Sequence, residues 1–325
     1  MTRGELIRFL IERFRNDNFI AFVCRLLRFA IIAFFSMKYN VAYKKKSRNE
    51  VLEVCGIKMN TPGSDTGISR DLAMNKSREP YITRAYTNLI KKGDVVLEAG
   101  ANIGYYALQA AKLVGETGLV YAIEPVSQNM KVLKENIELN NFNNVESYQL
   151  AIGDENGKGN IMISEKDNWC AMERTNTARA FVSSEKVDIV SVDSFLKNKR
   201  TPDFLRMDIE GYEYNVIKGM VKLLEKGIPQ RIFVEVHFNI LRDKAIEMLE
   251  ILKENDYEII VATVEPHPAV QNSPFGIQTT ALLDRFIGVG QGYIDIKIDD
   301  ILKNPIFRTG QVEWMEIIFE RKGND

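Results

Sequence analysis

Five side chains that can carry or exchange protons lie at the ends of two neighbouring apolar runs. Asp208, Glu210 and Glu213 come after the first run, and Glu235 and His237 end the second. Carboxylates and imidazoles are the usual general acids and bases of enzymes, and histidine titrates near neutral pH. The pattern predicts a catalytic site with His237 as the base, Asp208 orienting it or serving in its place, and Glu210 beside them.

Other roles for these residues stay open. Acidic residues near the start of a helix are stabilised by the helix dipole, so Asp208 and Glu210 could be helix caps. His237 could be a hydrogen-bonded histidine at a strand end. Asp208, Glu235 and His237 could together hold a divalent ion, because carboxylate and imidazole both suit such ions. Their spacing matches no metal-binding motif, however, and we predict that the site holds no metal.

A second group of residues lies between positions 94 and 125. There a short apolar run, a glycine turn, a helical pattern and another apolar run follow one another. This order predicts a βαβ unit, whose ligand lies beyond the carboxyl ends of the strands. The turn contains Gly100, Asn102 and Gly104, and glycines let a ligand approach the backbone closely. Glu124 ends the second run, where it could accept hydrogen bonds from two ribose hydroxyls.

The turn distinguishes between two kinds of nucleotide ligand. Dinucleotide sites use G-x-G-x-x-G, which brings a pyrophosphate onto a helix amino terminus. Here Asn102 stands in place of the middle glycine, and Glu98 precedes the turn. A carboxylate would repel a pyrophosphate but suits a ligand with an ammonium and a sulfonium group. We therefore predict S-adenosylmethionine as the cofactor. The alternative is a turn that only packs a helix on a sheet.

The elements that position these residues alternate between strand and helix from residue 93 onward. Alternation of this kind indicates a doubly wound α/β sheet with helices on both faces. After the βαβ unit, main-sheet strands are expected at 145–152, 204–209, 231–236, 258–263 and 312–320. An extra hairpin strand is expected at 159–164, and a long helix at 213–226.

Composition limits the class of protein. The chain has 325 residues, 45% of them apolar, which is enough for a substantial core. Its net charge of −1 argues against nucleic-acid binding. Residues 1–46 contain ten Lys or Arg and three acids, a net +7, which leaves −8 for the remainder. The three cysteines show neither disulfide nor metal spacing, which favours a reducing, cytoplasmic compartment.

The basic amino-terminal segment is apolar but interrupted by Arg25 and Arg28. Its uninterrupted run Phe29–Met37 is shorter than the ~20 residues that span a bilayer. Together with the cluster Lys44–Lys46, this predicts a helix that lies on an anionic membrane surface. A helix packed on the enzyme or in a homodimer is the alternative. The expected parts are this helix over 1–46, a leading hairpin and helix over 47–92, and the catalytic domain over 93–325.

Five motifs carry a resemblance to a known family. They are E-A-G-A-N-I-G, Y-A-I-E-P, A-I-G-D-E-N-G, V-D-S-F-L and P-D-F-L-R-M-D-I-E-G-Y-E. Over roughly residues 52–265 the chain is similar to the FkbM family of S-adenosylmethionine-dependent methyltransferases. The resemblance implies the Rossmann-like, mostly parallel seven-stranded sheet of class I methyltransferases. It also implies O-methylation of a hydroxyl on a sugar, polyketide or related metabolite.

The resemblance further implies the cofactor contacts. Glu124 would hold the ribose, and Ala151 and Ile152 would flank the adenine. The residues for the methionine part would be Glu98, Gly100, Asn102 and Gly104. Many members have Asp where Glu98 stands, a small change of reach. The basic amino-terminal helix lies outside the family's core, and it favours a glycan or lipid-linked acceptor at a membrane over a soluble metabolite.

Two other classes of protein remain as alternatives. One is a nicotinamide-dependent oxidoreductase on a similar sheet, although Asn102 argues against it. The other is a non-catalytic protein that binds S-adenosylmethionine. We expect the acceptor to be selected by the loop 165–185 and the segment 265–310, neither of which contains a recognisable motif.

Overall fold

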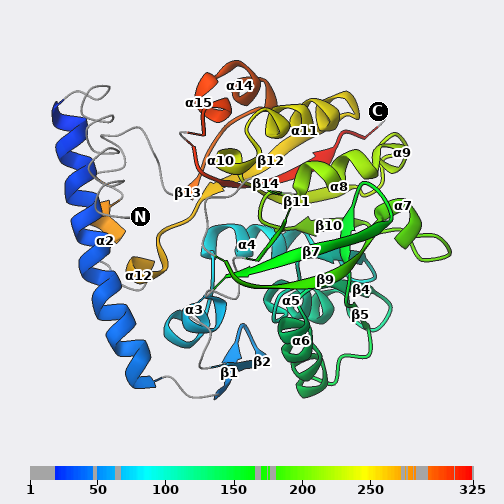
Figure 1. Ribbon diagram of the computed structural model, residues 1–325, viewed down its shortest axis with the longest axis horizontal. Helices are drawn as coiled ribbons and strands as arrows, with labels where there is room; N and C mark the ends of the chain where they lie inside the picture. The colour runs from blue at the N-terminus through cyan, green and yellow to red at the C-terminus, as the bar shows by residue number, and fades with distance from the viewer. Residues whose placement is uncertain are drawn as a thin grey trace. The chain divides into compact units, whose positions relative to one another are not determined.

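The computed structural model of the chain is shown in Figure 1. It describes residues 19–46, 50–62, 67–164, 170–173, 175, 181–271, 275, 277–280, 282, 292–310 and 312–323. The chain forms two compact units. The smaller comprises Met1–Ser47 and Val264–Ile294, and the larger comprises Arg48–Thr263 and Asp295–Asp325.

Seven strands of the main sheet belong to the larger unit. They lie side by side in the order β12-β14-β11-β10-β3-β4-β5. Their bounds are β3 Val95–Ala99, β4 Leu119–Ile123, β5 Val145–Tyr148, β10 Phe204–Met207, β11 Arg231–Val236, β12 Tyr257–Val264 and β14 Met315–Arg321. Only β14 runs antiparallel to its neighbours, β11 and β12. The predicted Rossmann-like, mostly parallel seven-stranded sheet is therefore confirmed.

The strand order reverses next to β3. From β3 the chain adds β4 and β5 on one side, and then returns to add β10 and β11 on the other. Ligands of doubly wound sheets bind at such a switch point, beyond the carboxyl ends of the strands. The central strands are apolar runs with both faces covered, as parallel strands require. In β3, for example, Val96 and Leu97 are completely buried.

Helices pack on both sides of these strands (Figure 1). The longer ones are α4 Pro80–Leu89, α5 Tyr105–Val114, α6 Ser127–Leu139 and α11 Asp243–Glu254. Shorter ones are α7 Val192–Phe195, α10 Phe238–Leu241, α14 Ile298–Lys303 and α15 Pro305–Arg308. The helix expected at 213–226 is broken into α8 Glu213–Gly219 and α9 Val221–Leu224. A Cβ added to Gly219 would lie 2.5 Å from the Gly153 carbonyl oxygen, so the helix passes very close to this part of the chain. Met220 leaves the helical conformation.

A second sheet corrects the prediction for residues 145–164. The expected third strand ends at Tyr148, because the Leu150 N–H bonds back to the Tyr148 carbonyl and turns the chain out of the main sheet. The strands that follow form a separate sheet in the order β6-β9-β7-β8. Their bounds are β6 Ala151–Gly153, β7 Gly157–Ser164, β8 Ala171–Met172 and β9 Phe181–Ser191. The predicted hairpin strand, β7, pairs along its length with β9 rather than with its predecessor.

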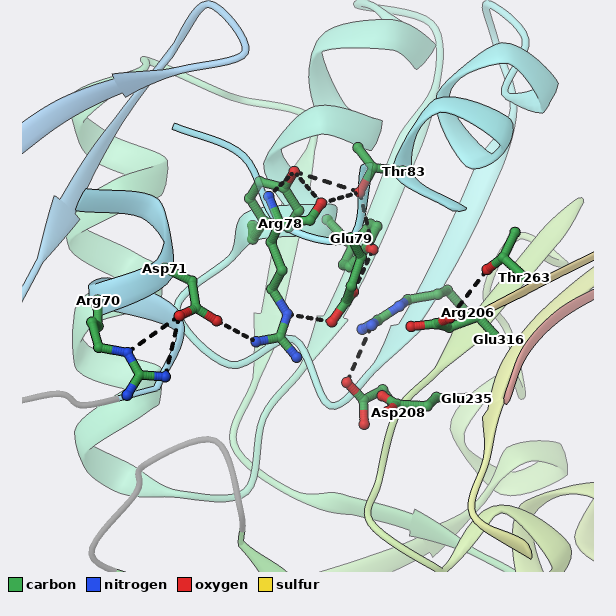
Figure 2. A network of polar contacts seen from close by, with 12 residues as sticks. Arg70, Asp71, Arg78, Glu79, Thr83, Arg206, Asp208, Glu235, Thr263 and Glu316 are labelled. Carbon is green, nitrogen blue, oxygen red and sulfur yellow. Dashed lines mark hydrogen bonds and ion pairs between the residues drawn. The ribbon is translucent and has the colours of Figure 1, made fainter. Parts of the chain in front are cut away.

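The segment before β3 belongs to the larger unit. Its hairpin consists of β1 Glu50–Val54 and β2 Ile57–Thr61, and it is followed by α3 Ile68–Asn75 and α4. Helix α3 was not predicted. Pro80 occupies the first turn of α4, where its missing N–H costs nothing. These helices bring Arg78, which lies between them, to the edge of the main sheet (Figure 2).

The smaller unit contains helix α2, Phe19–Lys46, against which α12, Pro268–Gln271, packs. It also holds β13, Gly292–Tyr293. Helix α2 continues through both arginines, and Ile20–Lys44 is long and apolar enough to cross a membrane by length and composition, with a mean hydropathy of 2.0. Our argument that the segment is too briefly apolar to span is therefore wrong. Soluble core helices and signal sequences meet the same criterion.

Candidate active site

A cavity opens at the carboxyl ends of β3, β4 and β10, where the strand order reverses. The empty space in it and at its mouth is about 870 Å³. Residues from four of the five motifs meet there, and the fifth motif, V-D-S-F-L, contributes none. The lining of the cavity includes Gly100, Asn102, Glu124, Ala151, Ile152, Asp208 and Glu210. The sequence motifs therefore predicted most of the wall of one site.

The glycine turn fits tightly against the neighbouring strand. Gly100 has φ +81°, and a Cβ there would lie 2.2 Å from the carbonyl oxygen of Asp208. Gly104 has φ +100° and begins α5. Asn102 adopts a left-handed conformation, φ +49°, which asparagine tolerates better than most residues. The turn thus requires glycine where β3 and β10 approach each other most closely.

Glu124 closes this turn from the end of β4. Its Oε2 accepts a hydrogen bond from the Asn102 N–H at 2.8 Å, and its Oε1 accepts one from the Val126 N–H at 2.9 Å. Burial raises the pKa of Glu124 to about 7, although these hydrogen bonds favour the charged form. Oε1 also accepts a longer hydrogen bond from Asn129 Nδ2 at 3.4 Å, whereas Oε2 keeps a lone pair for a ligand hydroxyl. Glu124 therefore ends β4 and lines the cavity, as predicted, and its contact with a ribose stays a prediction.

The second sheet forms the apolar wall of the cavity. Ala151 and Ile152 line it beside Leu150, and Ile161 and Met172 extend the wall. Four of these side chains are nearly or fully buried, and Met172 belongs to the same core cluster as Ala151 and Ile161. A flat aromatic ring such as adenine fits an apolar slot of this kind.

Glu98 differs from its predicted role. It is completely buried and is not among the residues that line the cavity. Its Oε1 accepts a hydrogen bond from Arg206 Nη1 at 2.7 Å, and burial raises its pKa to about 7 against the effect of Arg206. The carboxylate therefore holds Arg206, which lines the cavity in its place. In this geometry Glu98 does not directly contact the space expected for the methionine part of the cofactor.

Arg206 was missed in the sequence. Its guanidinium lies 4.1 Å from the centre of the Tyr106 ring, and its Nη2 is 3.2 Å from Asp208 Oδ2 (Figure 2). A charged residue within the apolar run F-L-R-M signals a buried ion pair, because an unpaired charge would be very costly there. Arg206 thus links Glu98, below the site, to the carboxylate of Asp208 at its surface.

Arg78 is a second cation that sequence reasoning missed. It lines the cavity from outside the segment that carries the motifs. Its Nε is 2.5 Å from Glu79 Oε1, and its Nη1 is 3.6 Å from Asp71 Oδ2 (Figure 2). Burial disfavours its charge, but Glu79 and Asp71 outweigh burial and raise its pKa well above the ordinary value. No sequence motif indicated this residue, because α3 and α4 alone bring it to the site.

The predicted catalytic residues do meet at the ends of β10 and β11. His237 is 4% exposed, and its Nδ1 is 2.9 Å from Glu213 Oε1. Its Nε2 is 3.2 Å from Glu210 Oε2 and 3.8 Å from Glu235 Oε1. Figure 2 shows the Asp208 and Glu235 side chains next to each other. The cluster therefore surrounds one imidazole with carboxylates.

This environment does not suit His237 as a general base. Burial alone would lower the pKa of His237, but Glu210 and Glu213 outweigh it and raise that pKa well above its usual value. The imidazole therefore already holds a proton near neutral pH. Asp208 is the opposite case: burial would raise its pKa, but Arg206 and His237 lower it. Because Asp208 and Glu210 also line the cavity, carboxylates rather than His237 face a substrate.

The same cluster contains three groups that could bind a metal ion. Ligand atoms of Asp208, Glu235 and His237 lie within 4.8 Å of one another. Burial, followed by the neighbouring Asp208, raises the pKa of Glu235 well above its ordinary value. The sequence argument against a metal considered only spacing along the chain, whereas these ligands come from two strands.

Comparison with known proteins places the chain in a family. Residues 98–259 match the family model of the methyltransferase FkbM domain. "Methyltransferase 1" of Beauveria bassiana is 24% identical over 144 residues, which are 38% of this chain and 57% of that protein. A protein-L-isoaspartate O-methyltransferase of Ignicoccus hospitalis is 39% identical over 56 residues, 17% of this chain and 26% of that protein. The chain thus spans little more than half of one curated relative and about a quarter of the other.

Solved structures give weaker similarity. Methyltransferase FkbM from Methylobacillus flagellatus aligns over 61% of this chain and 50% of that one, with 14% identity and a TM-score of 0.38. A SAM-dependent O-methyltransferase from Thermotoga maritima aligns over 85% and 79%, with 13% identity and a TM-score of 0.38.

The strand order, the glycine turn and the acid at the end of β4 are those of the class I S-adenosylmethionine-dependent methyltransferase fold. Within this class, residues 98–259 belong to the FkbM methyltransferase domain family. The predicted family, enzyme class and cofactor are thereby confirmed at the level of the family. The acceptor and the roles of individual residues stay predictions.

Proposed function

We propose that the chain transfers a methyl group from S-adenosylmethionine to a hydroxyl of a sugar, glycan or lipid-linked acceptor. One observation carries the proposal. A single cavity has the glycine turn and Glu124 on one side and the carboxylates Asp208 and Glu210 on the other. A nucleoside held by Glu124 and the apolar wall would direct its sulfonium toward these carboxylates.

The chemistry requires little more than this arrangement. The acceptor oxygen attacks the methyl carbon in line with the carbon–sulfur bond, which breaks to give S-adenosylhomocysteine. The hydroxyl proton passes to a carboxylate that faces the cavity, and we assign this task to Glu210, with Asp208 beside it. A methyl ether forms. Arg206 holds Asp208 in place at 3.2 Å, and both Arg78 and Arg206 line the cavity, where they can meet the carboxylate of the methionine part.

The membrane-proximal acceptor rests on helix α2. Several large apolar side chains on it are exposed, among them Phe29 at 58% and Met37 at 62%. Only 6% of its most apolar window is buried, unlike the core helix of a soluble protein. Lys44, near the end of the helix, is exposed, and the cluster Lys44–Lys46 suits an anionic lipid surface. An enzyme held at a membrane would meet glycans and lipid head groups there.

Metabolite profiling tests the acceptor. A strain that lacks this chain should accumulate a glycan or lipid-linked compound lighter by one methylene than the wild-type product. Purified enzyme and S-adenosylmethionine should then convert that compound to the wild-type product. If the deletion changes only soluble metabolites of another class, or nothing, the acceptor assignment is wrong.

Flotation with anionic liposomes tests the membrane contact. The full chain should float, and substitution of exposed side chains, Phe29→Glu with Met37→Glu, should abolish flotation without unfolding the protein. Extraction by high salt would indicate a surface helix, and resistance to alkaline carbonate a spanning one. If the full chain stays with the soluble fraction in both assays, α2 has another role, such as a subunit interface.

A further inference from the structure

The strand-end cluster consists of Asp208, Glu210, Glu213, Glu235 and His237. Its arrangement resembles a cation site more than a simple hydrogen-bond network. Asp208 follows β10, Glu235 lies in β11 and His237 follows it, so three adjacent positions of the sheet edge contribute one ligand atom each. Those atoms lie within 4.8 Å of one another. Two trans ligands on one divalent ion are ~4.0–4.4 Å apart when metal–ligand bonds are ~2.0–2.2 Å long, so a small inward movement of these side chains would let them share one ion.

The orientation of His237 is the second observation. Glu213 Oε1 contacts Nδ1 at 2.9 Å, which turns Nε2 toward Glu210 and Glu235. A carboxylate behind the ring in this way is the usual support of a metal-bound histidine. The second oxygen of Glu213 is buried and has no hydrogen-bond partner in the described part of the chain, although Glu213 is completely buried. Glu213 Oε1 also accepts a hydrogen bond from the Gly211 N–H at 3.0 Å, so the turn after β10 and the imidazole ring share one carboxylate oxygen.

Charge is the third observation. Four carboxylates surround the site, those of Asp208, Glu210, Glu213 and Glu235. Arg206 is in contact with Asp208, and it is shared with Glu98 at 2.7 Å. An ion bound to His237 Nε2 would displace the proton of the ring and take its place as the positive charge beside these carboxylates.

We propose that Asp208, Glu235 and His237 bind a divalent cation at the edge of the cavity. Two carboxylates and one imidazole are a mixed oxygen and nitrogen set that suits Mn²⁺ best, with Zn²⁺ as the competitor. Asp208 lines the cavity, so positions on the ion that the protein leaves open would face an acceptor. The ion would orient the acceptor hydroxyl and lower its pKa. Glu210, whose Oε2 is 3.2 Å from His237 Nε2, would lie beside the ion and take the proton.

The site can be tested without any acceptor, because ion binding does not depend on methyl transfer. The full chain is dialysed against EDTA and titrated with Mn²⁺, and the free ion is followed by its EPR signal. One Mn²⁺ should bind per chain. Glu235→Gln and His237→Gln should each weaken binding at least tenfold. Glu213→Gln should weaken it about 10- to 100-fold, the usual effect of a residue that supports a ligand.

The controls separate this inference from the proposed function. Asp243→Asn removes a carboxylate that is 75% exposed and should bind Mn²⁺ like the wild type. Titration of the same samples with S-adenosylmethionine, and circular dichroism, show whether each variant is folded. If a ligand variant does not fold, Asp208→Asn replaces it. Absence of Mn²⁺ and Zn²⁺ binding to a wild type that binds cofactor, or equal binding by all folded variants, overturns the proposal.

Discussion

Replacement of Glu124 by glutamine is the most informative single change in the cofactor site. The substitution keeps the size and one acceptor oxygen but replaces the other by a donor. In the structure Oε2 accepts a hydrogen bond from the Asn102 N–H at 2.8 Å, and Oε1 accepts them from the Val126 N–H at 2.9 Å and from Asn129 Nδ2 at 3.4 Å. We predict that this carboxylate also accepts a hydrogen bond from the ribose. Glu124→Gln should therefore remove one hydrogen bond between a ribose hydroxyl and a charged group.

The size of the effect follows from that bond. A hydrogen bond to a charged group contributes ~1.5–3 kcal/mol, which corresponds to a rise of about 10- to 150-fold in the dissociation constant of S-adenosylmethionine. Isothermal titration calorimetry measures it. The titration belongs at pH 8, where the wild-type carboxylate is charged, because its pKa is about 7.

Two comparisons make this result specific. Glu116→Gln changes an exposed carboxylate and should leave the affinity unchanged. A cofactor analogue that lacks both ribose hydroxyls should bind the wild type and Glu124→Gln equally. If the folded variant binds S-adenosylmethionine as tightly as the wild type, or loses affinity equally for the analogue, Glu124 does not hold the ribose.

Three further predictions concern buried residues of the site. Arg206→Met leaves the buried Glu98 without its partner, so urea unfolding should show a loss of ~3–5 kcal/mol in unfolding free energy. Adding Glu98→Gln to this variant should restore part of the loss. An unchanged unfolding midpoint would contradict the buried ion pair. Gly100→Ala should weaken cofactor binding at least tenfold, since its φ of +81° and its contact with β10 exclude a Cβ, whereas Gly157→Ala, with nothing within 4 Å, should not. Burial raises the pKa of Glu124 from 4.5 to about 7, so the folded protein holds an extra proton and loses stability as pH rises through 7. Relative to wild type, Glu124→Gln should therefore gain up to about 3 kcal/mol of unfolding free energy between pH 5 and pH 8. A difference between the two proteins that does not vary with pH would contradict the raised pKa.

Local patterns predicted the central part of the fold well. The run ending at Glu98, the helix over residues 105–114 and the strand over 119–123 lie where the sequence placed them, because burial on both faces and helical periodicity act within a few residues. The third strand was too long in the prediction. Its apolar pattern continues past Tyr148, and only a local turn at Leu150 moves the remainder into another sheet.

For the functional residues, too, local patterns predicted some positions, while contacts between distant parts of the chain decided the others. Asp208, Glu210 and Glu124 lie at strand ends within recognisable motifs, so their meeting at one cavity could be predicted from topology. The role of His237 could not, because its pKa is raised by the carboxylates of Glu210, after β10, and Glu213, in α8. Arg78 could not either, since it reaches the cavity through helices outside the motifs.

Several expectations fall on residues that the structure does not describe. In the loop 165–185, only residues 170–173, 175 and 181–185 are described, and Cys170 and Met172 do line the cavity. The segment 265–310 is likewise described only in part. Selection of the acceptor by these regions stays a prediction.

A crystal structure of the chain with S-adenosylhomocysteine is the most direct test of the cofactor site. One molecule should occupy the cavity at the ends of β3, β4 and β10, with both ribose hydroxyls within hydrogen-bond distance of Glu124. Its adenine should lie against Ile152, and its sulfur should point toward Asp208 and Glu210. Density for the ligand at any other place, or with its ribose away from Glu124, would contradict the proposed site.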